Sequence, residues 1–166
     1  MLSKAMQDAI NEQIKNELYS AYLYLAMSNH FEEKNLNGFA NWLRVQFEEE
    51  QEHALKFLDY VHDRGGQVVL KAIDQPPSSF GTNLEVFQQV LEHEKKVTSL
   101  IHKLYELALK ENDYPTQIML QWFIDEQVEE EKNASEIIAK LEMIEAHGTA
   151  VLMLDHDLGK RKSGGD

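Results

Sequence analysis

Six polar residues occur where the apolar stripe of a helix should continue, and their spacing repeats. They are Glu17, Glu50 and His53 in the first half of the chain and Glu94, Gln127 and Glu130 in the second half. In each half the second residue follows the first by 33 positions and the third follows by 3 more, and the two sets are offset by 77. Carboxylates that are buried together lose their hydration and repel one another, so they must share protons or bind cations.

The charge of this set favours a pair of divalent cations. Four carboxylates carry four negative charges, and two divalent ions neutralise them. Oxygen-rich ligation with one imidazole suits Fe(II) or Mn(II) better than metals that prefer thiolates. Glu50 and Glu130 are natural bridging ligands, one from each half. The alternative is a buried polar network without a metal, but such a network does not require a duplicated spacing.

Long helical periodicity between chain breakers predicts the elements that carry these residues. Gly65-Gly66 is typical of a helix C-terminus, Thr82-x-x-Glu85 of a capping box, and Pro115 of a first helical turn. The expected helices span residues 4–34, 38–64, 83–111, 114–146 and 149–158. We therefore expect an all-α fold, with the fifth helix short and apolar.

The connections predict how the helices are arranged. Two short turns make the first and second pairs of long helices antiparallel hairpins. The connection over 66–82 reaches about 55 Å when extended at about 3.3 Å per residue, whereas a helix of about 30 residues is about 45 Å long. It can therefore cross the whole bundle, which gives a four-helix bundle with one long crossover plus a short fifth C-terminal helix.

The turns also place the six polar residues at one level. Facing residues of an antiparallel hairpin have their midpoint in the turn. The midpoint of residues 17 and 53 is 35, inside the first turn, and the midpoint of 94 and 130 is 112, inside the second. All six side chains are thus expected to converge in the core.

Composition narrows the classes of function. The chain has 166 residues, no cysteine, and 29 Asp plus Glu against 16 Lys plus Arg, for a net charge of −13. This balance disfavours nucleic-acid binding, and the lack of cysteine excludes disulfides and thiol chemistry and fits the cytoplasm. No apolar run is long enough for a membrane span, and no signal peptide is visible. We expect one domain over 1–158 and a flexible tail over 159–166.

These features resemble the ferritin-like di-iron carboxylate family. Glu17 and Glu50-Gln51-Glu52-His53 match the family pattern, whereas Gln127-Val128-Glu129-Glu130 replaces the second Glu-x-x-His. This departure is similar to non-haem bacterial and archaeal ferritins rather than to bacterioferritins, and no methionine lies between Glu50 and His53, so no haem is expected. Further matching segments are Tyr19–Leu25, Arg64-Gly65-Gly66, Glu126–Glu131 and the last helix.

The resemblance implies a ferroxidase centre. One iron would bind Glu17, Glu50 and His53. The second would bind Glu50, Glu94 and Glu130, with Gln127 nearby. A third iron site would use residues beside the pair, namely Glu49, Glu126 and Glu129 together with Glu130. The alternative for Glu49, Glu126 and Glu129 is a solvated acidic face.

Two aromatic residues also have a role in the resemblance. Tyr24 would hydrogen-bond a ligand carboxylate and supply an electron. Trp122 is the second candidate for such a role. The alternative for both is ordinary aromatic core. The remaining histidines are expected at the surface or at subunit interfaces, and His93 is expected to point away from the metal pair. These histidines are His30, His62, His93, His102, His147 and His156.

The function that the resemblance implies is iron storage. Fe(II) would be oxidised by O2 or H2O2 and stored as ferric oxyhydroxide inside a hollow homo-oligomeric shell of twenty-four subunits, with the helix over 149–158 in subunit contacts. Three alternatives remain at this point: a non-storing di-iron oxidase or peroxidase, a purely structural helical bundle, and a DNA-protecting mini-ferritin. The ligand set within one bundle and the fifth helix disfavour the last of these.

Overall fold

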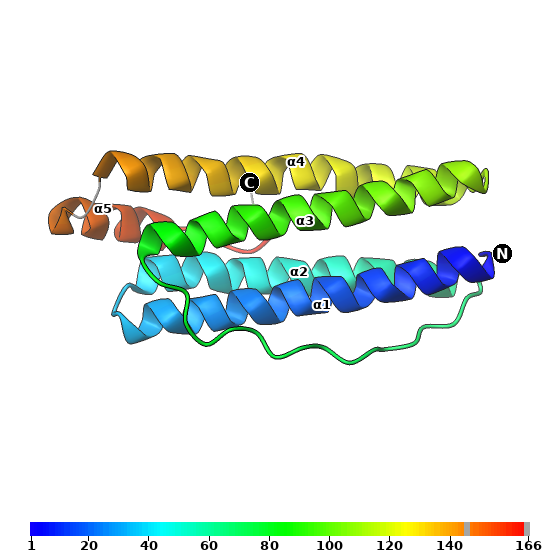
Figure 1. Cartoon of the computed structure of the whole chain (residues 1–166), viewed down its shortest axis with the longest axis horizontal. Coiled ribbons are helices and arrows are strands. Elements are labelled where there is room, and N and C mark those ends of the chain that lie inside the picture. Colours follow the sequence, from blue (N-terminus) through cyan, green and yellow to red (C-terminus); the bar gives the residue numbers. More distant parts are fainter. Residues whose placement is uncertain (145–146, 165–166) are drawn as a thin grey trace.

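The chain forms five helices, which a computed structural model describes over residues 1–144 and 147–164. They are α1 (Lys4–Glu33), α2 (Asn37–Asp63), α3 (Asn83–Lys110), α4 (Tyr114–Ile144) and α5 (Gly148–Leu158). Figure 1 shows the α1–α2 hairpin lying beside the α3–α4 hairpin, with the 64–82 connection running the length of the bundle. The prediction of an all-α bundle with one long crossover and a short fifth helix is confirmed.

The observed helix ends lie within one residue of the expected ones wherever both are described. The expected end at residue 146 falls outside the described residues. Thr82 and Glu85 form the reciprocal capping box at the start of α3. Asn35 and Asn112 adopt left-handed backbone angles, with φ of 58° and 54°, in the two hairpin turns. They are separated by the same 77 positions as the two polar sets, so the repeat includes the turns.

The apolar core is divided into two clusters by a polar layer. One cluster contains Phe31, Phe39 and Phe87, and the other contains Ile10, Phe57 and Phe123. Along α1, Ile14 belongs to one cluster and Tyr24 to the other, and Glu17 lies between them. Each large apolar side chain buried in these clusters contributes about 1.5–3 kcal/mol, which offsets the cost of burying the polar layer.

One side chain of α5 caps the start of α2. Asp155 Oδ1 accepts hydrogen bonds from the backbone N–H groups of Gly38 at 2.8 Å and Phe39 at 3.0 Å. Leu36, at the N-cap position of α2, makes no side-chain cap. A Cβ atom at Gly38 would lie 1.6 Å from the Asp155 carbonyl oxygen. Gly38 is therefore required for this close approach, and Asp155 caps α2 from a distant part of the chain.

We expect Asp155→Ala to loosen α5, because two N–H groups of α2 lose their acceptor. The free energy of unfolding should fall by about 1–2 kcal/mol, as for other lost helix caps. Hydrogen exchange of the α5 amides should accelerate. Asp155→Asn, which keeps a capping oxygen, should stay close to the unchanged protein. Equal α5 protection in all three proteins would show that the cap does not hold the helix.

None of the described helices combines the length and the apolar character that a membrane crossing requires.

Candidate metal centre

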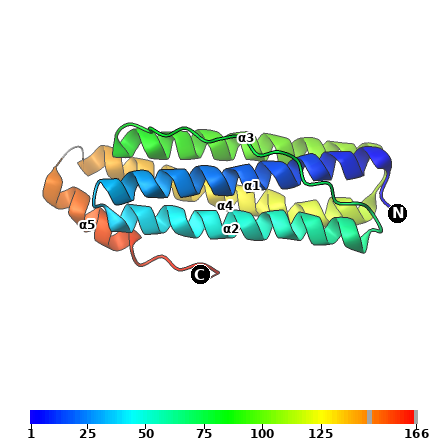
Figure 2. The ribbon, with the colours of Figure 1, turned by 90° about the horizontal axis from the view of Figure 1, so that it is seen from below.

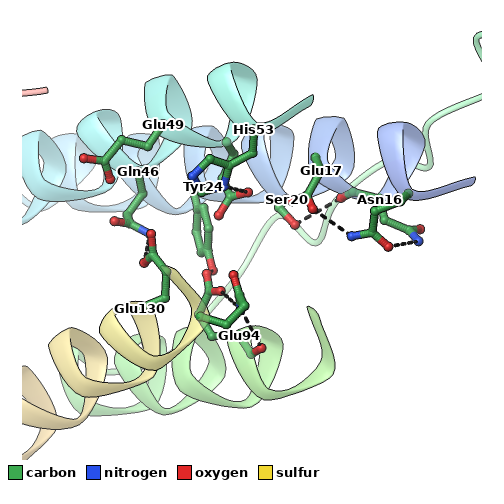
Figure 3. Close-up of polar contacts among 12 residues, drawn as sticks. Asn16, Glu17, Ser20, Tyr24, Gln46, Glu49, His53, Glu94 and Glu130 are labelled. Carbon is green, nitrogen blue, oxygen red and sulfur yellow. Dashed lines mark hydrogen bonds and ion pairs between the residues drawn. The ribbon is translucent and has the colours of Figure 1, made fainter. Parts of the chain in front are cut away.

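All six predicted residues lie in the polar layer between the two apolar clusters. None of these residues is more than 5% exposed. In Figure 3, Glu17 and His53 approach from the α1–α2 hairpin, and Glu94 and Glu130 approach from the α3–α4 hairpin. The helical stripes and the two matched turns thus bring residues from four helices to one level of the core.

Two groups of side chains are close enough to share an ion. Glu17, Glu50 and His53 each offer one ligand atom within 4.8 Å of the others, and His53, Glu126 and Glu130 do the same. The first group is the set expected for one iron. The second group joins two residues expected in the pair, His53 and Glu130, to one expected in the third site, Glu126. Glu94 belongs to neither group.

Several carboxylate oxygens in this layer lack any donor. Glu17 Oε2 and both oxygens of Glu50 are buried without a hydrogen-bond partner in the described part of the chain. His53 Nδ1 lies 3.4 Å from Glu50 Oε2, without hydrogen-bond geometry. Buried polar atoms are normally hydrogen-bonded, and unpaired buried anions are costly. Oxygen atoms aimed into a shared space with one imidazole fit a hard or borderline divalent cation such as Fe(II).

The other oxygens are held by amides and a phenol. Gln13 Nε2 donates to Glu17 Oε1 at 2.7 Å, and Gln46 Nε2 donates to Glu130 Oε2 at 2.9 Å. Tyr24 donates its hydroxyl hydrogen to Glu94 Oε1. Such partners fix the orientation of a carboxylate, and at Glu17 they leave the second oxygen without a donor in the described residues.

Gln127 donates hydrogen bonds to Glu94. Its Nε2 lies 3.1 Å from Glu94 Oε2, 3.2 Å from the Glu94 carbonyl oxygen and 3.2 Å from Thr98 Oγ1. An amide nitrogen donates and cannot bind a cation, so ligation by Gln127 would have to use its oxygen. In the structure Glu94 is therefore fixed from both sides, by Tyr24 and by Gln127.

The sequence analysis missed Gln13 and Gln46, although the signal was present. They precede Glu17 and Glu50 by four residues each, and they are separated by the same 33 positions. Residues four apart lie on one helix face. The corresponding positions of the second half are Val90 and Phe123, so this pair of amides belongs to the first hairpin alone.

Burial makes three of the carboxyl groups weak acids. Desolvation, followed by the charge of neighbouring carboxylates, raises the pKa of Glu50 well above its usual range. Desolvation also raises the pKa of Glu94 to about 7, against the opposing hydrogen bonds from Tyr24 and Gln127. For Glu130, desolvation and then the charge of Glu94 raise the pKa to about 8.

These pKa values predict that the metal-free protein loses stability as pH rises. Glu94 and Glu130 retain protons in the fold above their ordinary value of 4.5, whereas the unfolded chain has released them. The stability is therefore complete at about pH 4.5 and falls as pH rises through about 7–8, by up to about 1.4 kcal/mol per pH unit for each retained proton. Urea unfolding of chelator-treated protein between pH 5 and 9 measures this slope. A flat or rising profile would contradict it.

The residues expected at the third site line a neighbouring cavity of about 1170 Å³. Its wall includes Glu49, Glu126, Glu129, Glu130 and His53. Glu49 differs from the others because Arg161 Nη2 lies 2.6 Å from its Oε2. Burial raises the pKa of Glu49, and the charge of Arg161 opposes that effect.

The two predicted aromatic residues have different surroundings. Tyr24 is fully buried and bonded to Glu94. Trp122 is 40% exposed, so it is not a core residue. Its ring lies 5.5 Å from that of His53, and Lys56 Nζ lies 3.9 Å from its centroid. Both rings thus border the centre, and their role in electron transfer stays a prediction.

His93 is half-buried between α1 and α3 and is not a fully exposed surface residue. Its Nε2 lies 2.7 Å from Ser20 Oγ, and its ring meets that of Tyr24 edge-on at 5.8 Å. Burial lowers the pKa of His93 to about 4, so the ring is neutral near pH 7. The sequence did not reveal this contact, because it depends on how closely α1 and α3 approach.

Comparison with known proteins agrees with this geometry. The ferritin-like domain family matches residues 7–144. A bacterial non-heme ferritin of Bacteroides fragilis (strain 638R) is 43% identical over 161 residues, covering 97% of this chain and 100% of that protein. An engineered closed form of Archaeoglobus fulgidus ferritin superposes with a TM-score of 0.97 at 47% identity, covering 98% of this chain and 99% of that chain. A humanized archaeal ferritin gives a TM-score of 0.98 at 45% identity, covering 99% and 100%. The chain belongs to the ferritin family.

Proposed function

We propose that this protein oxidises and stores iron. Two Fe(II) ions bind in the polar layer, O2 or H2O2 oxidises them, and the ferric product passes to a mineral inside a shell of identical copies. The observation that carries the proposal is the set of buried carboxylate oxygens of Glu17 and Glu50 that have no donor in the described chain. Membership in the ferritin family supports iron as the cation.

Each ligand has a distinct part in this proposal. Glu17, Glu50 and His53 bind the first iron, and Glu50, Glu94 and Glu130 bind the second. Glu50 bridges the two ions, in keeping with two free oxygens at the centre of the layer. To bind the second iron, Glu94 must give up at least one of the hydrogen bonds that its oxygens accept from Tyr24 and Gln127.

The chemistry balances with two metal ions. Oxidation of two Fe(II) to Fe(III) releases two electrons, which with two protons convert O2 to H2O2 or H2O2 to two waters. Hard anionic ligands favour the more highly charged Fe(III). Tyr24 can supply one further electron from beside Glu94. The raised pKa values of Glu94 and Glu130 mean that metal binding at neutral pH releases protons from these groups.

The cavity beside the pair offers the next binding position. We assign Glu49, Glu126 and Glu129, together with Glu130, to a third iron site. All four line the same cavity, and Glu130 also lies in the buried layer. An ion could therefore pass between the two positions on a shared carboxylate.

Storage requires a container, because one bundle has no room for mineral. Exposed apolar residues occur on α5, where Leu152 is 62% and Met153 is 70% exposed, and on the crossover, where Leu70 is 67% exposed. Such surface favours contacts with further copies. We propose a hollow shell of twenty-four chains, in agreement with the family resemblance, and a cytoplasmic location stays a prediction.

The experiment that tests storage is aerobic loading with excess Fe(II). The shell-sized species is isolated by gel filtration, and iron per chain is measured. Iron far in excess of the available ligands is the expected result. Iron limited to the two or three carboxylate sites would instead favour a non-storing di-iron oxidase. No bound iron would leave a structural bundle.

A further inference from the structure

The segment after α5 runs back alongside α2 (Figure 2). One of its residues, Arg161, lines the cavity beside the polar layer. Arg161 Nη2 lies 2.6 Å from Glu49 Oε2, and the two side chains are only 20% and 23% exposed. The Arg161 Nη1 atom lies 3.3 Å from the Trp42 carbonyl oxygen. Its guanidinium carbon lies 4.4 Å from the centre of the Trp42 ring. Arg161 is thus held by an anion, a carbonyl and an aromatic face.

The backbone of this segment is also fixed to α2. Asn41 Nδ2 donates to the Arg161 carbonyl oxygen at 3.0 Å and lies 3.4 Å from that of Gly159. These contacts anchor the segment to α2 through the side chains of Asn41 and Glu49 and through the ring and carbonyl of Trp42. These anchors include none of the six residues of the polar layer.

Neighbouring cations do not share the position of Arg161. Lys160 Nζ lies 3.1 Å from Asp157, and Lys56 lies over the Trp122 ring. Both line the cavity, but in the described residues neither pairs with a glutamate assigned to the third site. Arg161 is the cation that meets one of those glutamates directly.

We propose that Arg161 is an exchangeable counter-cation for Glu49. Its guanidinium pairs with the carboxylate that a third metal ion would use. Binding of a metal ion at the third site therefore opposes the docking of residues 160–162 on α2, and docking opposes metal binding. The inference rests on the proposed third site of an iron-storing ferritin. It goes further by making Arg161 a positioning residue that sets how readily this site fills.

Two consequences follow from the linkage of binding equilibria. If the metal ion weakens docking of Arg161, then Arg161 weakens binding of the ion by the same factor. The buried pair of sites, which Arg161 does not touch, fills first. The third position takes metal when the supply exceeds what that pair can hold.

The first test is calorimetric titration of the assembled, metal-free protein with Zn(II), which cannot be oxidised. Arg161→Gln should tighten the third equivalent by about tenfold relative to the first two, which serve as the internal reference. Arg161→Lys keeps the charge and should give an intermediate value. Glu49→Gln removes the contested carboxylate and should weaken the third equivalent whatever residue occupies position 161.

The second test follows the docked segment itself. Trp42 lies beneath the Arg161 guanidinium, and Trp122→Phe removes the other tryptophan. In that background, the third Zn(II) equivalent should change Trp42 emission, and the change should disappear when Arg161→Gln is added. A purely structural role for Arg161 would not tie Trp42 emission to the third equivalent.

The outcomes separate this inference from the proposed function. The inference is overturned if the third Zn(II) ion binds with the same affinity with and without Arg161, or if neither protein binds a third ion. The proposed function stands in either case, provided that two Zn(II) ions still bind tightly and Fe(II) is still oxidised. Failure to bind any Zn(II) and to oxidise Fe(II) overturns both. A third equivalent that is tighter in Arg161→Gln, accompanied by the Arg161-dependent emission change, supports the inference.

Discussion

Replacing Glu50 with alanine is expected to slow Fe(II) oxidation by about 10²–10³-fold, the usual effect of losing one strong electrostatic contact at a reacting centre. Glu50 is fully buried, and both of its oxygens lack donors in the described chain. No other side chain in the layer offers two free oxygens between the two hairpins. Stopped-flow absorbance of Fe(III) formation, with two Fe(II) per chain, measures the effect.

Glu48→Ala is the matched control, because it removes a glutamate from the same helix that lies outside the cavity wall and the polar layer. It should oxidise Fe(II) at the unchanged rate. Gel filtration should show that both variants assemble as the parent does. An oxidation rate in Glu50→Ala within a few-fold of the control would remove Glu50 from the centre.

The second large effect is a gain, and it concerns the stability of the metal-free protein. Glu50→Gln should make the metal-free protein more stable at pH 8 by about 1–4 kcal/mol, because a neutral group replaces a buried acid that repels its neighbours. For a chain of this size, each kcal/mol raises Tm by about 2–4 °C. Zn(II) should raise Tm strongly in the unchanged protein and weakly in the variant, since only the former retains the full binding site.

The pH dependence supplies the control for this prediction. Burial raises the pKa of Glu50 and so favours its protonated carboxyl group as pH falls, and a glutamine side chain resembles that neutral form. The two metal-free proteins should therefore have similar Tm values at pH 5 and diverge as pH rises. A variant that is less stable than its parent at pH 8 would indicate that Glu50 contributes to packing rather than binding an ion.

Together these expected effects mean that the carboxyl groups of the polar layer lower the stability of the metal-free protein. The polar layer interrupts an otherwise continuous apolar core, and several of its carboxyl oxygens have no hydrogen-bond donor among the described residues. Natural proteins commonly accept such a cost at functional positions. Cations restore the balance, so the metal-loaded protein is expected to be the more stable form.

Most of the fold could be predicted because the repeat encodes it. The same 33-residue and 77-residue spacings fix the helix pairing, the level of the polar layer and the two turns at Asn35 and Asn112. The long crossover followed from the reach of the 66–82 connection compared with the length of a helix. The positions of the six polar residues in one layer agree with the midpoint argument, and their assignment as ligands stays a prediction.

The remaining features depend on contacts between distant segments. The capping of α2 by Asp155 and the pairing of Arg161 with Glu49 join residues more than a hundred positions apart. No local pattern near residue 161 predicts this contact, and the sequence favoured a flexible tail there. The burial of His93 likewise depends on the approach of α1 and α3, which helical periodicity does not specify.

The most direct test of the di-metal centre is an anomalous difference map from crystals soaked anaerobically with Fe(II), recorded at the iron absorption edge. The account predicts two peaks about 3.5–4 Å apart, as in other two-metal sites, one beside Glu17 and His53 and one beside Glu94 and Glu130, with Glu50 between them. Peaks confined to surface carboxylates, with none in the polar layer, would contradict it.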